Sequence, residues 1–288
     1  MGRIASFLTA AAVAVSGWLP GAGSPPATGP RAVADPALVL RFIDVDQADA
    51  VLITLGRQAV LVDAGRADNI ILSLADYGVD SLVAAIASHN HDDHIGGMDA
   101  VVADIPIGRY FDNGRSPTND NARAVETWLS RKQVARGPPP WDPLRLGDAS
   151  VTVFPSNMDP ARASENNSSL GVLVERGSFR ALLTGDSEAE ALNAWLRAGV
   201  IPEVTVLKAA HHGARNGVTP GWLLRTRPEV VVISVGAKNR YNHPDPTALR
   251  YYLAGNRKIY RTDLDGTVTI TVDREGRYQV ATSGPTER

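Results

Sequence analysis

All six histidines of this 288-residue chain lie in three short motifs, and none lies elsewhere. They are His89, His91 and His94 in SHNHDDHIGG, His211 and His212 in LKAAHHGARNG, and His243 in NRYNHPDP. Imidazole is the commonest protein ligand for metals and suits both zinc and iron. A single buried histidine usually has a structural role, but three within six positions would bury several polar groups with nothing to bind. The sequence therefore predicts a fold that brings the three motifs together as one polar metal centre.

The composition is that of a globular protein without thiol chemistry. Hydrophobic residues make up 44% of the chain and charged residues 21%, and the length suits one large domain or two small ones. The chain contains no cysteine, so it can form no disulfide and offers no thiolate ligand. Any metal must therefore be held by nitrogen and oxygen atoms.

The N-terminal segment has the order of features that is typical of an export signal. Arg3 precedes an apolar run over residues 4–19, and a stretch rich in Pro, Gly and small residues follows. We expect residues 1–34 to be an export signal and linker, cleaved after Ala34 or nearer to Gly23, and the protein to be secreted or extracytoplasmic. The alternative is an uncleaved segment that anchors the protein in a membrane. Residues 35–288 are expected to form one domain, with no membrane domain left after signal removal.

Strands and helices are expected to alternate after residue 38, which favours the α/β class of folds. Apolar patterns predict strands over residues 39–45, 50–55, 59–62, 82–87, 151–154, 170–174, 180–183, 204–207 and 230–235, and helices over 69–77, 121–132 and 188–197. Residues 136–143 are expected to be a loop, and residues 267–272 and 278–282 a hairpin. Thr219-Pro220 and Asp245-Pro246 each combine a capping residue with proline, so two further helices should begin there. Each histidine motif thus follows an expected strand.

The H-x-H-x-D-H spacing of residues 89–94 can hold two metal ions. His89 and His91 are two positions apart in an extended segment, so they project to the same side and can bind one ion. Asp93 and His94 follow where the chain turns into a helix near Ile95, and they can bind a second ion. A carboxylate beside imidazoles suits Zn, Mn or Fe.

With this motif and several others, the chain resembles the metallo-β-lactamase superfamily. Within that superfamily it is similar to the extracytoplasmic-type C-terminal domain of ComEC-type DNA-uptake channels. The segments that carry the similarity are, in order, FIDVDQADAVLITL, LVDAG, SHNHDDHIGG, ENNSSLGVLVERGSFRALLTGD, LKAAHHGA, SVGAKNRYNHP and YRTDLDG. The resemblance implies a four-layer αββα metallo-β-lactamase sandwich, with the metals at one edge between its two sheets.

The resemblance also implies two divalent metal ions, Zn or Mn, and a set of ligands for them. The implied ligands are His89 and His91 for the first ion, Asp93, His94 and one histidine of the HHG motif for the second, and Asp186 as a bridge between both. We favour His212 as the ligand of that pair, which leaves His211 to contact substrate. Asp63 is expected to support the metal-binding loop, although an Asp before Ala-Gly is also ordinary turn chemistry.

The chain departs from the superfamily pattern at the first metal. Many superfamily hydrolases supply a third histidine there, yet no histidine occurs between Ile95 and Ala210. The segment ENNSS at residues 165–169 matches that position, and Asn167 is the candidate to reach the metal or the substrate. The alternative is a loop of turn-forming polar residues. The ComEC-type group also often has Asp where this chain has His91. We expect the first metal to bind more weakly than the second.

The expected reaction is a hydrolysis in which a hydroxide held between the two metal ions attacks a phosphorus or carbonyl centre. Asp93 is expected to steer this nucleophile, and His211 or His243 to protonate the leaving group or to bind an oxygen of the substrate. Further candidates for supporting the ligands or contacting substrate are Lys208, Asn239 and Tyr241.

Charge narrows the substrate class. Residues 201–261 contain ten Lys or Arg and three Asp or Glu, a net charge of +7, whereas the whole chain carries −2. This local excess of positive charge favours an anionic ester as the substrate, and the alternative is that these residues lie on solvated helix faces. The near-neutral charge of the whole chain argues against a broad nucleic-acid surface. We therefore expect a metal-dependent phosphodiesterase or nuclease, with DNA or RNA as first candidates and small or cell-wall phosphodiesters next. The alternatives are a hydrolase of a lactone or thioester, and a non-catalytic binding module.

Overall fold

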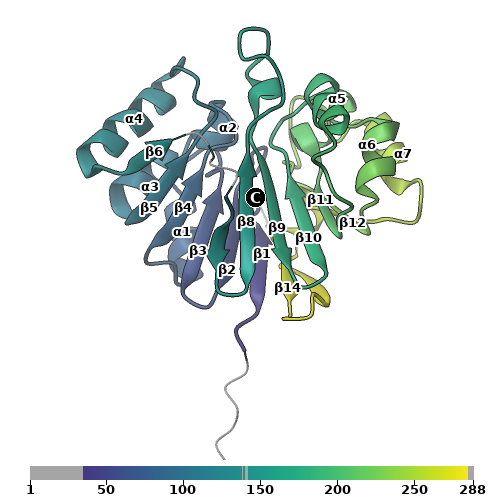
Figure 1. Cartoon of the computed structure of the whole chain (residues 1–288), viewed down its shortest axis with the longest axis horizontal. Helices are drawn as coiled ribbons and strands as arrows, with labels where there is room; N and C mark the ends of the chain where they lie inside the picture. The colour runs from purple at the N-terminus through teal and green to yellow at the C-terminus, as the bar shows by residue number, and fades with distance from the viewer. Residues whose placement is uncertain (1–34, 138, 140–141, 285–288) are drawn as a thin grey trace, which may run out of the picture. The chain divides into compact units, whose positions relative to one another are not determined.

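The computed structural model describes residues 35–137, 139 and 142–284. The expected export signal over residues 1–34 lies outside the described residues. Within the described part of the chain, the strands form one sheet of eight and one of seven (Figure 1). Both sheets combine an antiparallel part with a parallel part.

The first sheet carries the N-terminal half of the chain and the C-terminal hairpin. Its strands, in spatial order, are β15 (Tyr278–Thr282), β14 (Val268–Val272), β1 (Leu38–Phe42), β2 (Val51–Leu55), β3 (Gln58–Val62), β4 (Leu82–Ile86), β5 (Ile107–Phe111) and β6 (Ala135–Gly137). The strands from β15 to β3 pair antiparallel, and those from β3 to β6 pair parallel. The predicted hairpin is confirmed, since Val272 pairs with Tyr278 and Val268 with Thr282.

The second sheet has a similar division. Its spatial order is β13 (Lys258–Arg261), β12 (Val230–Ile233), β11 (Val206–Lys208), β10 (Phe179–Leu183), β9 (Gly171–Arg176), β8 (Ala149–Phe154) and β7 (Leu144–Leu146). The strands from β7 to β10 pair antiparallel, and those from β10 to β13 pair parallel. The carboxyl ends of the parallel strands supply the loops that carry the histidine motifs.

Helices cover the outer face of each sheet (Figure 1). On the first sheet these are α1 (Ile70–Asp76), α2 (Asp92–Ile95), α3 (Met98–Asp104) and α4 (Asp120–Lys132), and on the second they are α5 (Ala189–Ala198), α6 (Pro220–Thr226) and α7 (Pro246–Leu253). The remaining short turns are α8 (Thr262–Asp265), η1 (Asn166–Ser168), η2 (Ala210–Gly213) and η3 (Arg215–Gly217). The predicted starts of α6 and α7 are confirmed, because Thr219 and Asp245 accept hydrogen bonds from their first turns.

Alternation along the strands produces three hydrophobic layers. Leu40 and Ile53 face the space between the two sheets, whereas Leu52, next to Ile53, faces the helices of the first sheet. In β12, Val232 likewise faces the other sheet and Val231 faces the helices of the second. Because side chains alternate between the two faces of a strand, each fully buried sheet must be apolar on both sides. The four-layer αββα architecture is therefore confirmed.

The sequence patterns missed the strands at the margins of the sheets. β5, β6, β7 and β13 were not predicted, and β6 includes the first two residues of the expected loop at 136–143. Three of these strands lie at sheet edges, where one flank is unpaired and polar residues are tolerated. Their sequences, such as ARG and KIYR, therefore lack the apolar run of a central strand. Among the described residues, no helix has the length and apolar content that crossing a membrane requires.

Two glycines let the histidine loop lie directly on the loop that follows β3. A Cβ on Gly96 would lie 2.3 Å from the carbonyl oxygen of Arg66, and one on Gly97 would lie 2.5 Å from that of Ala67. Real Cβ atoms do not approach backbone this closely. The backbone between α2 and α3 is thus in contact with residues 64–67, which places Asp93 and His94 beside the end of β3.

Gly97→Ala should lower the free energy of unfolding by about 1–3 kcal/mol, because the new methyl group can be accommodated only by moving α2 from residues 64–67. The control is Gly137→Ala, since a Cβ at Gly137 meets no atom of the described residues within 4 Å. This control should change stability by less than about 0.5 kcal/mol. Denaturant unfolding of both variants measures the difference. Equal stability of the two would contradict the close packing.

Candidate metal centre

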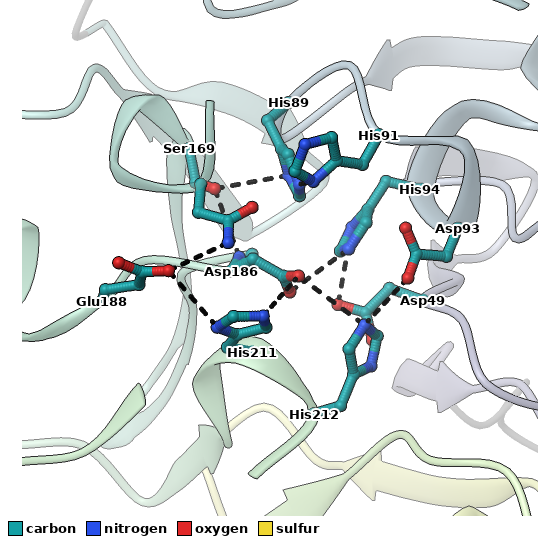
Figure 2. A network of polar contacts seen from close by, with 12 residues as sticks. Asp49, His89, His91, Asp93, His94, Ser169, Asp186, Glu188, His211 and His212 are labelled. Carbon is teal, nitrogen blue, oxygen red and sulfur yellow. Dashed lines mark hydrogen bonds and ion pairs between the residues drawn. The ribbon is translucent and has the colours of Figure 1, made fainter. Parts of the chain in front are cut away.

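Loops from both sheets meet at one edge of the sandwich. Asp63 follows β3, the first histidine motif follows β4, Asp186 follows β10, and the histidine pair follows β11. Figure 2 shows His89, His91 and His94 on one side of Asp186 and His211 and His212 on the other. The first two histidine motifs are thus brought together by loops from both sheets, whereas His243 of the third motif lines the cleft beside His211, with ring centroids 5.8 Å apart.

His94 and His212 each present one ring nitrogen to Asp186. His212 Nδ1 lies 2.9 Å from the carbonyl oxygen of Ser234, which can only accept, so Nδ1 carries a proton and Nε2 is the nitrogen that is placed to bind a metal. This Nε2 lies 3.7 Å from Asp186 Oδ2 and 3.6 Å from Asp93 Oδ2. His94 Nε2 lies 3.2 Å from Asp186 Oδ1. Asp93, His94 and His212 therefore form a compact group of three ligand atoms, the set expected for the second metal.

These residues fit a divalent cation. Three of their atoms, His94 Nε2, His212 Nε2 and Asp186 Oδ1, are buried, and among the described residues their polar neighbours are other members of this same cluster. Buried polar atoms without partners are costly, and these converge on one another. Imidazole nitrogens and carboxylate oxygens in such a cluster are the ligands that Zn²⁺ takes in proteins. A bound cation would satisfy all three atoms.

Asp63 supports the centre from behind. Its carboxylate accepts hydrogen bonds from the backbone N–H of Ser88 at 2.7 Å and from Ser88 Oγ at 2.8 Å. Its Oδ2 also lies 2.8 Å from His94 Nδ1. Burial raises the pKa of Asp63, although the contact with His94 opposes that shift. A carboxylate on Nδ1 directs the Nε2 of the same ring to the opposite side, where it faces Asp186.

His89 and His91 form the other side of the centre. His89 Nε2 lies 3.0 Å from His91 Nδ1, so the two rings project to the same side as their spacing predicted. His89 is buried while His91 is exposed. Burial, and then the neighbouring His94, lower the pKa of His89 well below its usual value. The neutral imidazole that binds metals is therefore the favoured form of His89.

Asn167 is engaged by Glu188. Its Oδ1 accepts a hydrogen bond from the backbone N–H of Glu188 at 3.0 Å, and its Nδ2 lies 3.5 Å from Glu188 Oε2. The neighbouring Asn166 lines the cleft instead. Within this segment, Ser169 Oγ lies 3.4 Å from His89 Nδ1. No imidazole from residues 95–210 completes the first position.

The backbone between His89 and His91 is held from both sides by residues that the sequence did not single out. The N–H of Asn90 donates to Glu165 Oε1 at 2.8 Å, and its carbonyl accepts from Asn119 Nδ2 at 2.5 Å. Glu165 is itself held by Arg115 at 2.9 Å. These contacts fix the direction of both imidazoles at the metal position that has fewest ligands.

Lys208 and Asp49 form a buried ion pair beneath the centre. Burial alone would lower the pKa of Lys208, but Asp49 raises it above its ordinary value. Asp49 Oδ1 lies 3.5 Å from His212 Nδ1. Lys208 therefore has a supporting position and does not line the cleft, while Asp49, which the motifs did not single out, belongs to the same group.

The histidine pair adopts an uncommon backbone conformation. His211 and His212 both have φ of 52°, in the left-handed region that non-glycine residues rarely occupy. This conformation directs His212 into the centre and His211 toward the cleft, where His211 Nε2 lies 3.8 Å from Asp186 Oδ2. Its Nδ1 lies 3.7 Å from Glu188 Oε1. Strain of this kind is concentrated at functional sites.

An open cleft of about 350 Å³ leads to the centre. Its rim includes Arg66, Arg240, Tyr241 and His243, as well as His211. Of the basic residues in the segment 201–261, Arg240 is the one among the described residues that lines this cleft. The excess charge predicted to attract an anion is therefore mostly elsewhere, and the positive charge at the rim comes from two arginines. Asn239 does not reach the cleft and instead bonds to the backbone of its own loop.

Comparisons with known proteins agree with this geometry. The family model of the metallo-beta-lactamase superfamily matches residues 43–236. The chain is 28% identical to ComE operon protein 3 of Bacillus subtilis (strain 168), covering 83% of this chain and 34% of that protein. It is 27% identical to the competence protein ComA of Neisseria gonorrhoeae, covering 86% of this chain and 34% of that protein. The chain thus spans about a third of the length of these relatives, and the resemblance inferred from the motifs is confirmed.

Solved structures show the same fold. CmlA, a diiron beta-hydroxylase from Streptomyces venezuelae, has a TM-score of 0.52 at 18% identity, over 81% of this chain and 54% of that one. Tm1679, a metal-dependent hydrolase of the beta-lactamase superfamily, has a TM-score of 0.51 at 10% identity, over 86% of this chain and the whole of the other. At such identities the likeness concerns the fold alone.

Titration of metal-free protein with Zn²⁺ or Mn²⁺ should show two separable binding steps, with the weaker step at the position of His89 and His91. The reason is the absence of a third imidazole there. His91→Ala should remove the weaker step and leave the tighter one, and because His91 is exposed the variant should remain folded. Isothermal titration calorimetry measures both steps. Two equally tight ions in the unmodified protein would contradict this assignment.

Glu165→Ala should weaken the first metal step by about 10–100-fold and leave the second unchanged, because it releases the backbone between the two histidines. Glu165→Gln keeps an oxygen acceptor for the N–H of Asn90 and should bind metal more tightly than the alanine variant. Glu190→Ala, at an exposed glutamate of α5, is the matched control. A loss that is shared equally by both steps would argue against a role confined to the first position.

Proposed function

The chain belongs to the metallo-beta-lactamase superfamily, and from this premise we propose that it is a metal-dependent hydrolase of phosphodiesters. One observation carries the proposal. Asp186 and His212 line a cleft that Arg66 and Arg240 also line, and the buried Nε2 of His94 lies directly behind Asp186, 3.2 Å from its Oδ1. A cation site below and two guanidinium groups above suit an anionic ester, since its charge is compensated from both sides.

The residues of the cleft have different roles in the proposed hydrolysis. Divalent ions in such a centre supply Lewis acidity and lower the pKa of water toward neutrality. Asp93 and Asp186 border the metal positions, so their free oxygens can orient the attacking water. Arg240 and Arg66 line the cleft and can bind the non-bridging oxygens, and Arg66 does so from a position where its Nη2 lies 3.5 Å from Asp93 Oδ2.

The proposed reaction needs no reactant other than water and the ester. The oxygen of water forms a bond to phosphorus, the ester bond to the leaving oxygen breaks, and that oxygen takes up a proton. His211 and His243 both line the cleft, so either imidazole can hold a proton at the leaving oxygen. Glu188, 3.7 Å from His211 Nδ1, orients the ring of His211.

Nucleic acid is the first candidate for the substrate, and small or cell-wall phosphodiesters follow. The similarity to competence proteins supports this order. We further propose that the protein acts outside the cytoplasm, on the basis of the export signal predicted at residues 1–34.

Chelation should abolish turnover of a phosphodiester, and Mn²⁺ or Zn²⁺ should restore it. Asp186→Asn should lower kcat/KM by more than about 100-fold, because it removes charge from the centre where both metal positions meet. Asp76→Asn, at an exposed aspartate of α1, should remain within about twofold of the unmodified protein.

The substrates to be compared are bis(p-nitrophenyl) phosphate, single-stranded DNA, a lactone and a thioester. Turnover of the lactone or thioester without the phosphodiesters would replace the proposal with carbonyl hydrolysis. Full metal loading without turnover of any of the four would indicate a binding module. Full activity of Asp186→Asn would exclude the shared centre.

A further inference from the structure

One side chain closes the loop that carries the third histidine motif. Asn239 Nδ2 donates to the carbonyl oxygens of Gly236 and His243, each at 2.8 Å, and its Oδ1 accepts from the N–H of His243 at 2.8 Å. Three hydrogen bonds from one amide restrict the backbone of residues 236–243. The aromatic side chains of this loop are therefore held in defined positions at the rim of the cleft.

Three rings extend in a row from the metal centre to the rim. His211 lies against Asp186, and its ring centroid is 5.8 Å from that of His243 in an edge-on contact. His243 in turn stacks with Tyr241 at 5.8 Å and an interplanar angle of 20°. Tyr241 is 45% exposed and lines the cleft, so this ring contributes to the surface that a ligand meets.

The charge next to Tyr241 suits a phosphate. The guanidinium of Arg240 lies 5.1 Å from the centroid of the Tyr241 ring and within 3.0 Å of its hydroxyl oxygen, and Arg240 also lines the cleft. Its side chain is exposed, so it can exchange the contact with the ring for one with an anion. Two other arginines of the same half are engaged by acidic residues, Arg227 by Glu203 and Arg261 by Asp263.

We propose that Tyr241 is a specificity-determining residue that stacks a nucleobase of single-stranded nucleic acid whose neighbouring phosphate lies over the metal centre. The proposal rests on the phosphodiester hydrolysis proposed above and names the substrate of that site. An aromatic ring beside a cationic group is how proteins hold single strands, because every base offers a π-face. Bases in a duplex are already paired and stacked, so a duplex does not offer such a face.

The small positive charge of the cleft explains why stacking is required. Arg66 and Arg240 can contact about two phosphates, and the chain as a whole carries −2, so counterion release contributes little to affinity. Binding should then depend weakly on salt, with a slope of about −1.4 in a plot of log affinity against log salt. The bases must supply much of the remaining affinity.

The test is equilibrium binding of a short, end-labelled DNA strand to the metal-loaded protein in Ca²⁺, measured by fluorescence anisotropy. Tyr241→Ala should weaken binding about tenfold, whereas Tyr241→Phe, which keeps the ring face, should bind like the unmodified protein. An abasic strand of equal length should bind more weakly and should not distinguish the variants. Tyr251→Ala, at an exposed tyrosine of α7 outside the cleft, is the control for surface tyrosines and should have no effect.

Three results would overturn the proposal. They are equal binding by Tyr241→Ala and the unmodified protein, equal binding of the abasic and base-containing strands, and duplex binding as tight as that of the single strand. Hydrolysis of bis(p-nitrophenyl) phosphate is measured separately. Turnover of that ester together with any of these three results would reject the role of Tyr241 and leave phosphodiester hydrolysis in place. Base-dependent binding without turnover of any phosphodiester would instead reject the hydrolysis.

Discussion

Asp63 is buried where β3 ends, and its carboxylate binds Ser88 and His94 on the loop that follows the neighbouring strand β4. A buried carboxylate without partners costs several kcal/mol, so Asp63 is tolerated there only when the histidine loop is in place. Pairing of β3 with β4 and assembly of the centre are therefore coupled. The contact with Nδ1 of His94 also turns Nε2 of the same ring toward Asp186, which is contributed by the other sheet. One carboxylate thus connects the order of the strands to the geometry of the metal position.

The second constraint at this edge of the sandwich is the negative charge of its buried carboxylates. Asp49, Asp63 and Asp186 are all buried there, and Lys208 is the buried cation that pairs with Asp49. An anionic substrate would be repelled by such a group of carboxylates unless divalent cations compensated their charge. In the proposed reaction the metal ions are therefore needed to admit the substrate as well as to activate water. The arginines of the rim act outside this inner group, where solvent weakens their field.

The central strands of the fold could be predicted from the sequence because they are apolar on both faces. The patterns of β3, β4, β10 and β12 show this, and the C-terminal hairpin shows the alternation of a sheet with one polar face. The strands at the edges of the sheets could not be predicted in this way. β6 and β7 are three residues long, and β13 has little apolar character, because an edge strand is stabilised by its partner and not by burial of its own side chains. Such segments therefore have no hydrophobic pattern from which a strand could be predicted.

The sequence by itself identified the candidate ligand types and their grouping, because the two-residue spacing of His89 and His91 places both side chains on one side and the chain then turns into the helix that contains Asp93 and His94. It also led correctly to the superfamily. Only the tertiary structure decided which residues hold that set in place. Glu165 and Asn119 reach the backbone of Asn90 from distant segments, and Asn167 turns to Glu188. These contacts depend on how loops from two sheets meet at one edge. Because the contacting residues are far apart in the sequence, no local sequence pattern indicates them.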